Sequence, residues 1–114
     1  MATRRSGTTA AGARKTAKAP LDDYLVETLM PDLVGHDHSP SSFLVYVKLW
    51  HAAGGPGRRG IAISLSNLAA ETGLSKSSVQ SALARLQKRG LVRSSRSGPT
   101  AVPVYVVLAP WRRG

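Results

Sequence analysis

The chain contains no cysteine, so disulfide frameworks, thiolate zinc sites and cysteine nucleophiles are excluded. Aromatic residues make up only 5%, and no apolar run approaches the ~20 residues that a membrane helix needs. Acidic residues are also scarce, with 6 Asp and Glu against 16 Lys and Arg. At 114 residues the chain provides one small domain, which excludes a multidomain enzyme.

The excess of positive charge, formally +10, is distributed unevenly along the chain. Residues 1–19 carry five basic residues and no acid, and residues 20–38 carry five acids and no Lys or Arg. Residues 39–114 carry eleven basic residues against Glu71 alone. This imbalance favours a polyanion as the partner, because each phosphate that Lys or Arg neutralises releases condensed counterions. The alternative is a basic protein that its charge merely keeps in solution.

Residues 1–19 contain no Val, Leu, Ile or aromatic residue. Such a segment cannot bury enough apolar surface to offset the entropy of ordering its backbone, so we expect a disordered basic arm. The Arg-rich, acid-free composition also fits an organelle transit peptide, which would be removed from the working protein. We expect residues 20–110 to form the folded domain and residues 111–114 a C-terminal tail.

Two helices are predicted in the first half of the domain. The first begins at Pro20, follows a helical spacing of apolar residues and is expected to end at Pro31. The second has Ser39 as its N-cap and runs over Pro40–Ala53. Because it is apolar nearly all round, it is either buried on more than one side or reserved for a partner chain, and it is the candidate interface of a homodimer.

Residues 64–92, with the sequence SLSNLAAETGLSKSSVQSALARLQKRGLV, predict two capped helices joined by a glycine turn. Ser64 caps the first helix and Ser75 the second. Gly73 can take the left-handed conformation that a sharp turn requires, and the small Ala69 lets the two helices cross closely. The pattern is typical of a helix-turn-helix.

The second of these helices has one apolar face and one polar face. The apolar stripe comprises Val79, Ala82, Leu83 and Leu86. The opposite face is short-chained near its start and basic farther along, so the helix start can approach a DNA groove while the basic residues reach phosphates. The alternative is an ordinary solvated face. The predicted DNA-contacting residues of this helix are Ser75, Lys76, Ser77, Ser78, Gln80, Ser81, Arg85 and Lys88.

The remaining segments predict short strands. Residues 61–63 are expected to form one strand, and residues 91–95 and 102–108 to form a hairpin around a turn rich in Gly, Pro and Ser. Pro103 cannot donate a ladder hydrogen bond, so we expect the second strand of the hairpin at an edge of the sheet.

The sequence at this point resembles the winged helix-turn-helix family of bacterial regulators over residues 40–108. The residues that carry the resemblance are Ala69, Gly73, Leu74, Val79 and the run Arg89-Gly90-Leu91-Val92. The helix that opens with Ser-Pro-Ser-Ser-Phe is equally similar to replication-initiation and phage-type modules.

The resemblance implies an α+β winged helix-turn-helix fold, with a helical core and a small C-terminal β-hairpin as the wing. It implies a transcriptional regulator that binds double-stranded DNA sequence-specifically, with the second helix in the major groove. Arg93 and Arg96 of the wing would then lie along the backbone or in the minor groove. The alternatives are a winged-helix module that binds protein or RNA, and a replication or partition accessory protein.

Catalytic, cofactor and metal sites are not expected. His36, Asp37 and His38 offer three ligands without a recognisable fourth, which argues against a metal. The serines have no matching His and Asp, and the carboxylates lie away from any Gly-rich phosphate loop. We therefore expect a cytoplasmic DNA-binding protein that is not an enzyme, has no membrane partner, and is associated with the nucleoid when bound.

Overall fold

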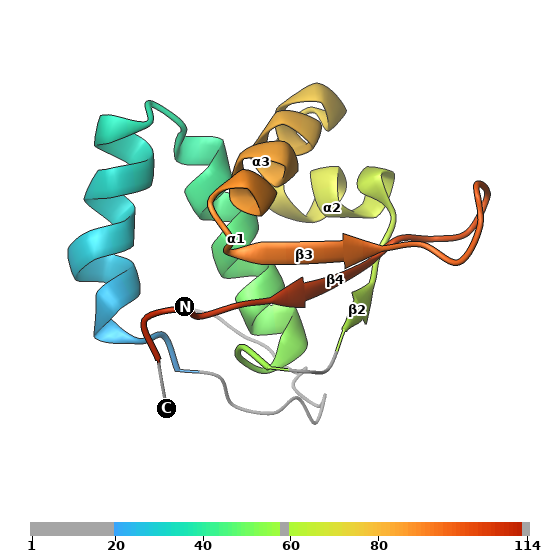
Figure 1. Ribbon diagram of the computed structural model, residues 1–114. Coiled ribbons are helices and arrows are strands. Elements are labelled where there is room, and N and C mark those ends of the chain that lie inside the picture. Colours follow the sequence, from blue (N-terminus) through green and yellow to red (C-terminus); the bar gives the residue numbers. More distant parts are fainter. Residues whose placement is uncertain (1–19, 58–59, 113–114) are drawn as a thin grey trace, which may run out of the picture.

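The computed structural model describes residues 20–57 and 60–112, and the predicted arm 1–19 lies outside this range. Three antiparallel strands form a sheet in the order β2-β4-β3, and helices pack against it (Figure 1). In chain order the elements are η1 (Leu25–Leu29), η2 (Pro31–His36), α1 (Pro40–Ala53), β2 (Ile61–Ala62), α2 (Leu65–Thr72), α3 (Lys76–Lys88), β3 (Val92–Ser95) and β4 (Val104–Val107). The helical core with its C-terminal hairpin confirms the predicted fold class.

The N-terminal helix differs from the prediction, because it does not end at Pro31. Residues 23–36 form one continuous helix, most of it wide π-type turns in which the Met30 amide donates to the Leu25 carbonyl. In a regular α-helix the proline ring would clash with the carbonyl four residues earlier, and a wider turn relieves that clash. The helix thus continues through the proline and buries Leu25, Leu29 and Leu33.

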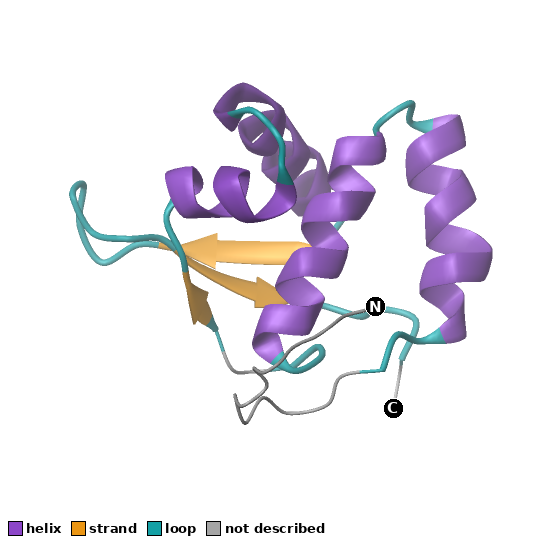
Figure 2. Ribbon diagram, turned by 180° about the vertical axis from the view of Figure 1, so that it is seen from behind, coloured by secondary structure: helices purple, strands orange, loops and turns teal. Residues whose placement is uncertain are grey.

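Helix α1 lies at the centre of the molecule, where it meets the N-terminal helix, the other two helices and the sheet. Figure 2 shows it crossing one face of the sheet, with the N-terminal helix beside it. Four of its side chains, Val45, Tyr46, Leu49 and Trp50, are 0% exposed. Burial on several sides therefore accounts for most of its all-round apolar character, and Leu44, at 47%, is the large apolar residue of α1 that stays exposed.

The position of β4 corrects a second expectation. It pairs with β3 on one side, Val92 opposite Val107, and with β2 on the other, Ile61 opposite Tyr105, so it is the central strand. Pro103 lies just before the strand, where its carbonyl accepts a hydrogen bond from the Ile63 amide at 3.3 Å. Its missing N–H is therefore tolerated without an edge position.

Aromatic side chains from near both ends of the described chain stack on one another and on α1. Trp111 stacks on Tyr24, with ring centroids 4.4 Å apart, and on Trp50 at 6.3 Å. Its indole N–H donates to the Asp22 carboxylate at 2.9 Å, and the Arg112 guanidinium binds both oxygens of the same carboxylate. Trp111 thus packs against the core, although it belongs to the segment predicted as a C-terminal tail.

Candidate nucleic-acid interface

The helix-turn-helix is built as its sequence predicts. The Ser64 hydroxyl accepts a hydrogen bond from the Asn67 amide, and the Ser75 hydroxyl accepts one from the Ser78 amide, both at 3.1 Å. Between the two helices Gly73 adopts a φ of +76°, and its amide donates to the Ala69 carbonyl at 2.9 Å. The two serine caps and the glycine turn therefore each fix one end of α2 or α3. Together they determine the orientation of α3 relative to α2.

The apolar stripe of α3 is buried, which confirms its predicted orientation. Val79, Ala82 and Leu86 are 0% exposed and Leu83 is 5% exposed. Seven of the eight predicted contact residues are exposed, namely Ser75, Lys76, Ser77, Gln80, Ser81, Arg85 and Lys88. The eighth, Ser78, is half-buried, and its hydroxyl accepts a hydrogen bond from the hydroxyl of Ser75 at 3.0 Å. The Ser75 hydroxyl therefore caps α3, and the Ser78 hydroxyl bonds to that cap.

One flank of α3 faces the wing across a groove. Gln80, Ala84 and Gln87 line it from the helix, and Arg96 lines it from the wing. The hydroxyl of Ser94 in β3 donates to the Gln87 side-chain oxygen at 3.1 Å, which ties the hairpin to the helix. The groove thus combines a glutamine pair with an arginine from a second element.

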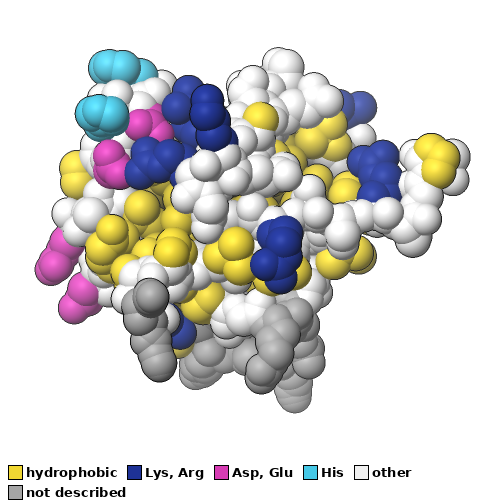
Figure 3. Space-filling view, viewed as in Figure 1, with side chains coloured by type: hydrophobic (Ala, Val, Ile, Leu, Met, Phe, Trp, Pro, Cys, Tyr) yellow, Lys and Arg dark blue, Asp and Glu magenta, His cyan; other side chains and the backbone are white. Residues whose placement is uncertain are grey.

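The two wing arginines lie on different sides of the sheet. Arg96 is exposed beside the groove, where its guanidinium donates to the Pro99 carbonyl at 3.3 Å. Arg93 precedes the inward-facing Ser94, and it lines a separate hollow with Pro56 and Arg112. Figure 3 shows the basic side chains of this view as separate clusters. The structure therefore brings Arg96, and not Arg93, to the exposed face of α3.

The other flank of α3 contacts the N-terminal helix through ion pairs. The Arg89 guanidinium pairs with Asp32 and with Asp37, the latter at 2.6 Å, and Arg85 approaches Asp37 at 3.5 Å. Two acids of residues 20–38 thus pair with the basic C-terminal end of α3. Sequence reasoning did not assign these partners, because the residues are 48 or more positions apart and only the packing of the two helices brings them together.

Hydrogen bonds set the charge state of this cluster. The His36 ring, bonded to Asp37 at 3.0 Å, and the guanidinium of Arg89 both hold the pKa of the Asp37 carboxyl below its usual value. The hydrogen bond to Asp32 is the main cause that raises the pKa of Arg89. Both groups are therefore charged at neutral pH.

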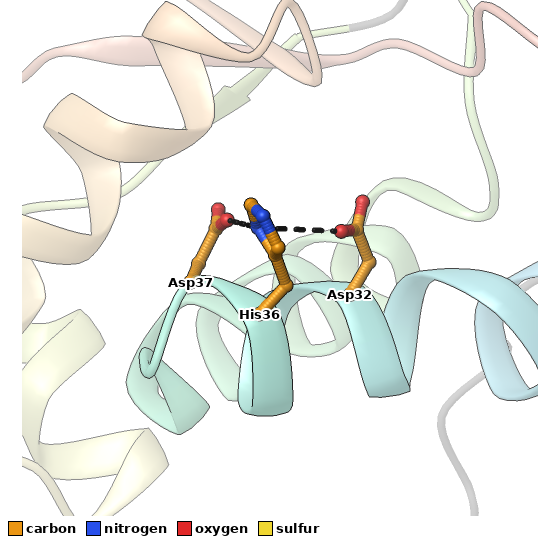
Figure 4. Close-up of side chains that lie close together, drawn as sticks. All are labelled: Asp32, His36 and Asp37. Atoms are coloured by element: carbon orange, nitrogen blue, oxygen red, sulfur yellow. Dashed lines mark hydrogen bonds and ion pairs between the residues drawn. The ribbon is translucent and has the colours of Figure 1, made fainter.

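Asp32, His36 and Asp37 come together as a group with metal-ligand chemistry (Figure 4), all three contributed by the end of the N-terminal helix. His38, the other histidine of the sequence pattern, is not part of the group. Both carboxylates already accept hydrogen bonds from Arg89, so their charge is balanced by the C-cap residue of α3. The arrangement is that of an ion-pair cluster between two helices.

A capped α2, a glycine turn, an α3 with a polar outer face and a β-hairpin beside it define a winged helix-turn-helix DNA-binding domain. Residues 49–100 match the model of the MarR family, and this segment contains the winged helix-turn-helix described above. The match runs from the last turns of α1 into the wing. Proteins of this family are DNA-binding transcriptional regulators and are not enzymes, which confirms those two predictions.

Searches of curated proteins and of solved structures gave no significant match to the chain. Within the described ranges, no helix combines the length and apolar character that crossing a bilayer requires. The family match therefore carries the functional assignment at the level of DNA binding and transcriptional regulation.

Proposed function

We propose that the protein binds double-stranded DNA sequence-specifically, with α3 in the major groove and the wing on the flanking backbone. The observation that supports this most is the outer ridge of α3. Ser77, Ser81 and Lys88 lie along it at helical spacing, all exposed. Short side chains near the helix start allow a close approach to base edges, and a basic residue farther along reaches phosphate.

The predicted residues divide into roles in this arrangement. Gln80 and Ser81 are assigned to base edges, because a glutamine amide can make a bidentate contact with adenine. Lys76, Lys88 and Arg96 are assigned to the backbone. Arg93, on the uncovered face of the sheet, would serve as a backbone contact reached from outside the groove. Ser75, Ser77, Ser78 and Arg85 complete the proposed set.

The rest of the organisation is also a proposal. Residues 1–19 act as a basic arm, residues 20–110 as the DNA-binding domain and residues 111–114 as a short tail, whose Trp111 and Arg112 pack on that domain. A homodimer through Pro40–Ala53 would use the exposed Leu44 together with Val47, at a hollow that α1 shares with α2. The setting is the cytoplasm, with the protein on the nucleoid when bound.

Binding measured across a salt series distinguishes this function from binding to RNA or to protein. Binding of the full chain to random-sequence duplex DNA, duplex RNA and single strands is measured by anisotropy, and the stoichiometry is recorded. We expect preference for duplex DNA, a steep salt dependence and enrichment of a sequence motif from a random duplex library. Equal binding to RNA or single strands, or no enriched motif, contradicts the proposal.

A further inference from the structure

The carboxylate of Asp37 lies within the basic flank of α3. Its side chain is only 7% exposed, and Arg89 and His36 each contact one of its oxygens. Its backbone amide donates to the Asp32 carbonyl at 2.9 Å, so the end of the N-terminal helix fixes its position. The burial of Leu25, Leu29 and Leu33 anchors that helix in turn. Asp37 is therefore a rigidly held negative charge.

Arg85 faces the same carboxylate but is much less confined. Its side chain is 44% exposed and approaches Asp37 at 3.5 Å, whereas Arg89 is closer and half-buried. Lys88, on the same half of α3, forms no ion pair within residues 20–57 and 60–112. Of these two exposed cations, Arg85 has a neighbouring carboxylate and Lys88 has none within the described ranges.

We propose that Asp37 is an affinity-setting residue, whose carboxylate competes with DNA phosphate for Arg85. Carboxylate and phosphate oxygens bind a guanidinium with the same geometry, so a phosphate contact by Arg85 requires this ion pair to be given up. The competition lowers the affinity for the DNA phosphate backbone equally on all sequences and does not change the contacts with bases. A regulator in which Asp37 pairs with Arg85 therefore binds non-specific DNA more weakly, because non-specific affinity is almost entirely electrostatic.

The inference rests on the proposed placement of α3 on DNA, and the test uses Asp32 as the matched control. Asp32 contacts Arg89 and lies 3.9 Å from His36, but it forms no ion pair with Arg85 within the described ranges. Asp37→Asn and Asp32→Asn therefore each remove one of the two carboxylates that pair with Arg89. Only Asp37→Asn also removes the ion pair of Arg85. Affinity for non-specific duplex DNA is measured for the parent and both variants across a salt series.

We expect Asp37→Asn to bind about 2- to 5-fold more tightly at low salt, the range of one exposed ion pair. The slope of log K against log salt should steepen by up to about 0.9, one further phosphate contact. Asp32→Asn should match the parent in both. In an Arg85→Gln background the gain should vanish. An equal gain in Asp32→Asn, or a gain that persists without Arg85, overturns the proposal.

A second comparison leaves Asp32, Asp37 and Arg89 unchanged, in case Asp37→Asn does not fold. Arg85→Gln should weaken binding less than Lys88→Gln, because Arg85 is already neutralised in the free protein. An equal or larger loss for Arg85→Gln contradicts the competition. If neither Lys88→Gln nor Lys76→Gln weakens binding, the placement of α3 on DNA fails instead, which separates the two outcomes.

Discussion

Gly73 shows how one residue determines the presentation of the recognition helix. It is the C-cap of α2, its φ is +76°, and two residues later Ser75 caps α3. A Cβ on Gly73 would meet no atom within 4 Å, so adding it creates backbone strain without a clash of the Cβ itself. The left-handed conformation is therefore what selects glycine at this turn.

We predict that Gly73→Val lowers the free energy of unfolding by about 1–3 kcal/mol, the usual cost of a strained left-handed residue. Gly73→Asn is the control, because asparagine tolerates this conformation and should cost less. Thermal unfolding of both variants tests the difference. A melting temperature for the valine variant equal to that of the parent would remove the strain argument.

Gln80 is the residue on which sequence preference depends in the proposed complex. It is exposed on α3 and lines the groove opposite Arg96. We predict that Gln80→Ala weakens preference for the selected site by about 1–3 kcal/mol, with little change in non-specific affinity. Competition binding with the selected duplex and a scrambled duplex gives the ratio. An equal loss on both duplexes would reassign Gln80 to the backbone.

At the scale of elements, Asp22 joins the start of the N-terminal helix to the segment after β4. The hydrogen bond from Arg112 is the main cause that lowers the pKa of Asp22, and the Trp111 indole adds to it. A carboxyl with a lowered pKa in the folded state stabilises the fold above its unfolded pKa of about 3.9, and this stabilisation is lost as pH falls through the folded value.

Asp22→Asn should therefore be less stable than the parent at neutral pH and should lose less further stability on acidification. Urea unfolding of the parent and the variant between about pH 7 and about pH 2 measures this difference. Asp23→Asn serves as the control, because Asp23 is exposed and forms no ion pair in the described part of the chain. If Asp22→Asn and the parent lose stability in parallel, the Arg112 contact does not stabilise the fold.

The sequence predicted the elements whose signals are local. The Ser39-Pro40 start of α1, both caps of the helix-turn-helix and the buried stripe of α3 each depend on residues within a few positions of one another. The errors arose where contacts between segments matter. The N-terminal helix packs against α1 and continues through Pro31 by a wider turn, and pairing with β2 makes β4 central.

The same limit applies to the candidate site. Helical periodicity predicted which residues of α3 are exposed. It could not predict which cations of this helix face an acid, because Arg85 and Arg89 lie 48 and 52 positions from Asp37. Strand alternation within the hairpin also does not identify which face of the sheet the helices cover. The side of the sheet on which Arg93 lies could therefore not be predicted from the sequence.

For the whole molecule, the acids of residues 20–38 act at two ends of the domain. Asp22 pairs with Arg112, and Asp32 and Asp37 pair with the end of α3. Three of the five acids in this segment thus neutralise specific arginines. Positive charge outside these pairs includes Lys76 and Lys88 on α3, Arg96 in the wing and, in sequence, the five basic residues of 1–19.

Those five basic residues lead to a prediction for the whole chain. A truncated protein that starts at Pro20 keeps the Pro20 carbonyl, which accepts a hydrogen bond from the Trp50 indole at 3.3 Å. Its melting temperature and site preference should therefore match those of the full chain. If about four of the five charges contact phosphates, the slope of log K against log salt should decrease in magnitude by about 3 to 4.

Deletion should thus weaken binding most at low salt while the specificity ratio barely changes, because backbone contacts carry no base information. A full-length variant with Arg4, Arg5, Arg14, Lys15 and Lys18 all changed to Gln controls for the length of the arm, and it should reproduce the slope of the truncation. A slope that deletion leaves unchanged would contradict the DNA-binding arm and would favour a transit peptide, since those residues would then be absent from the working protein.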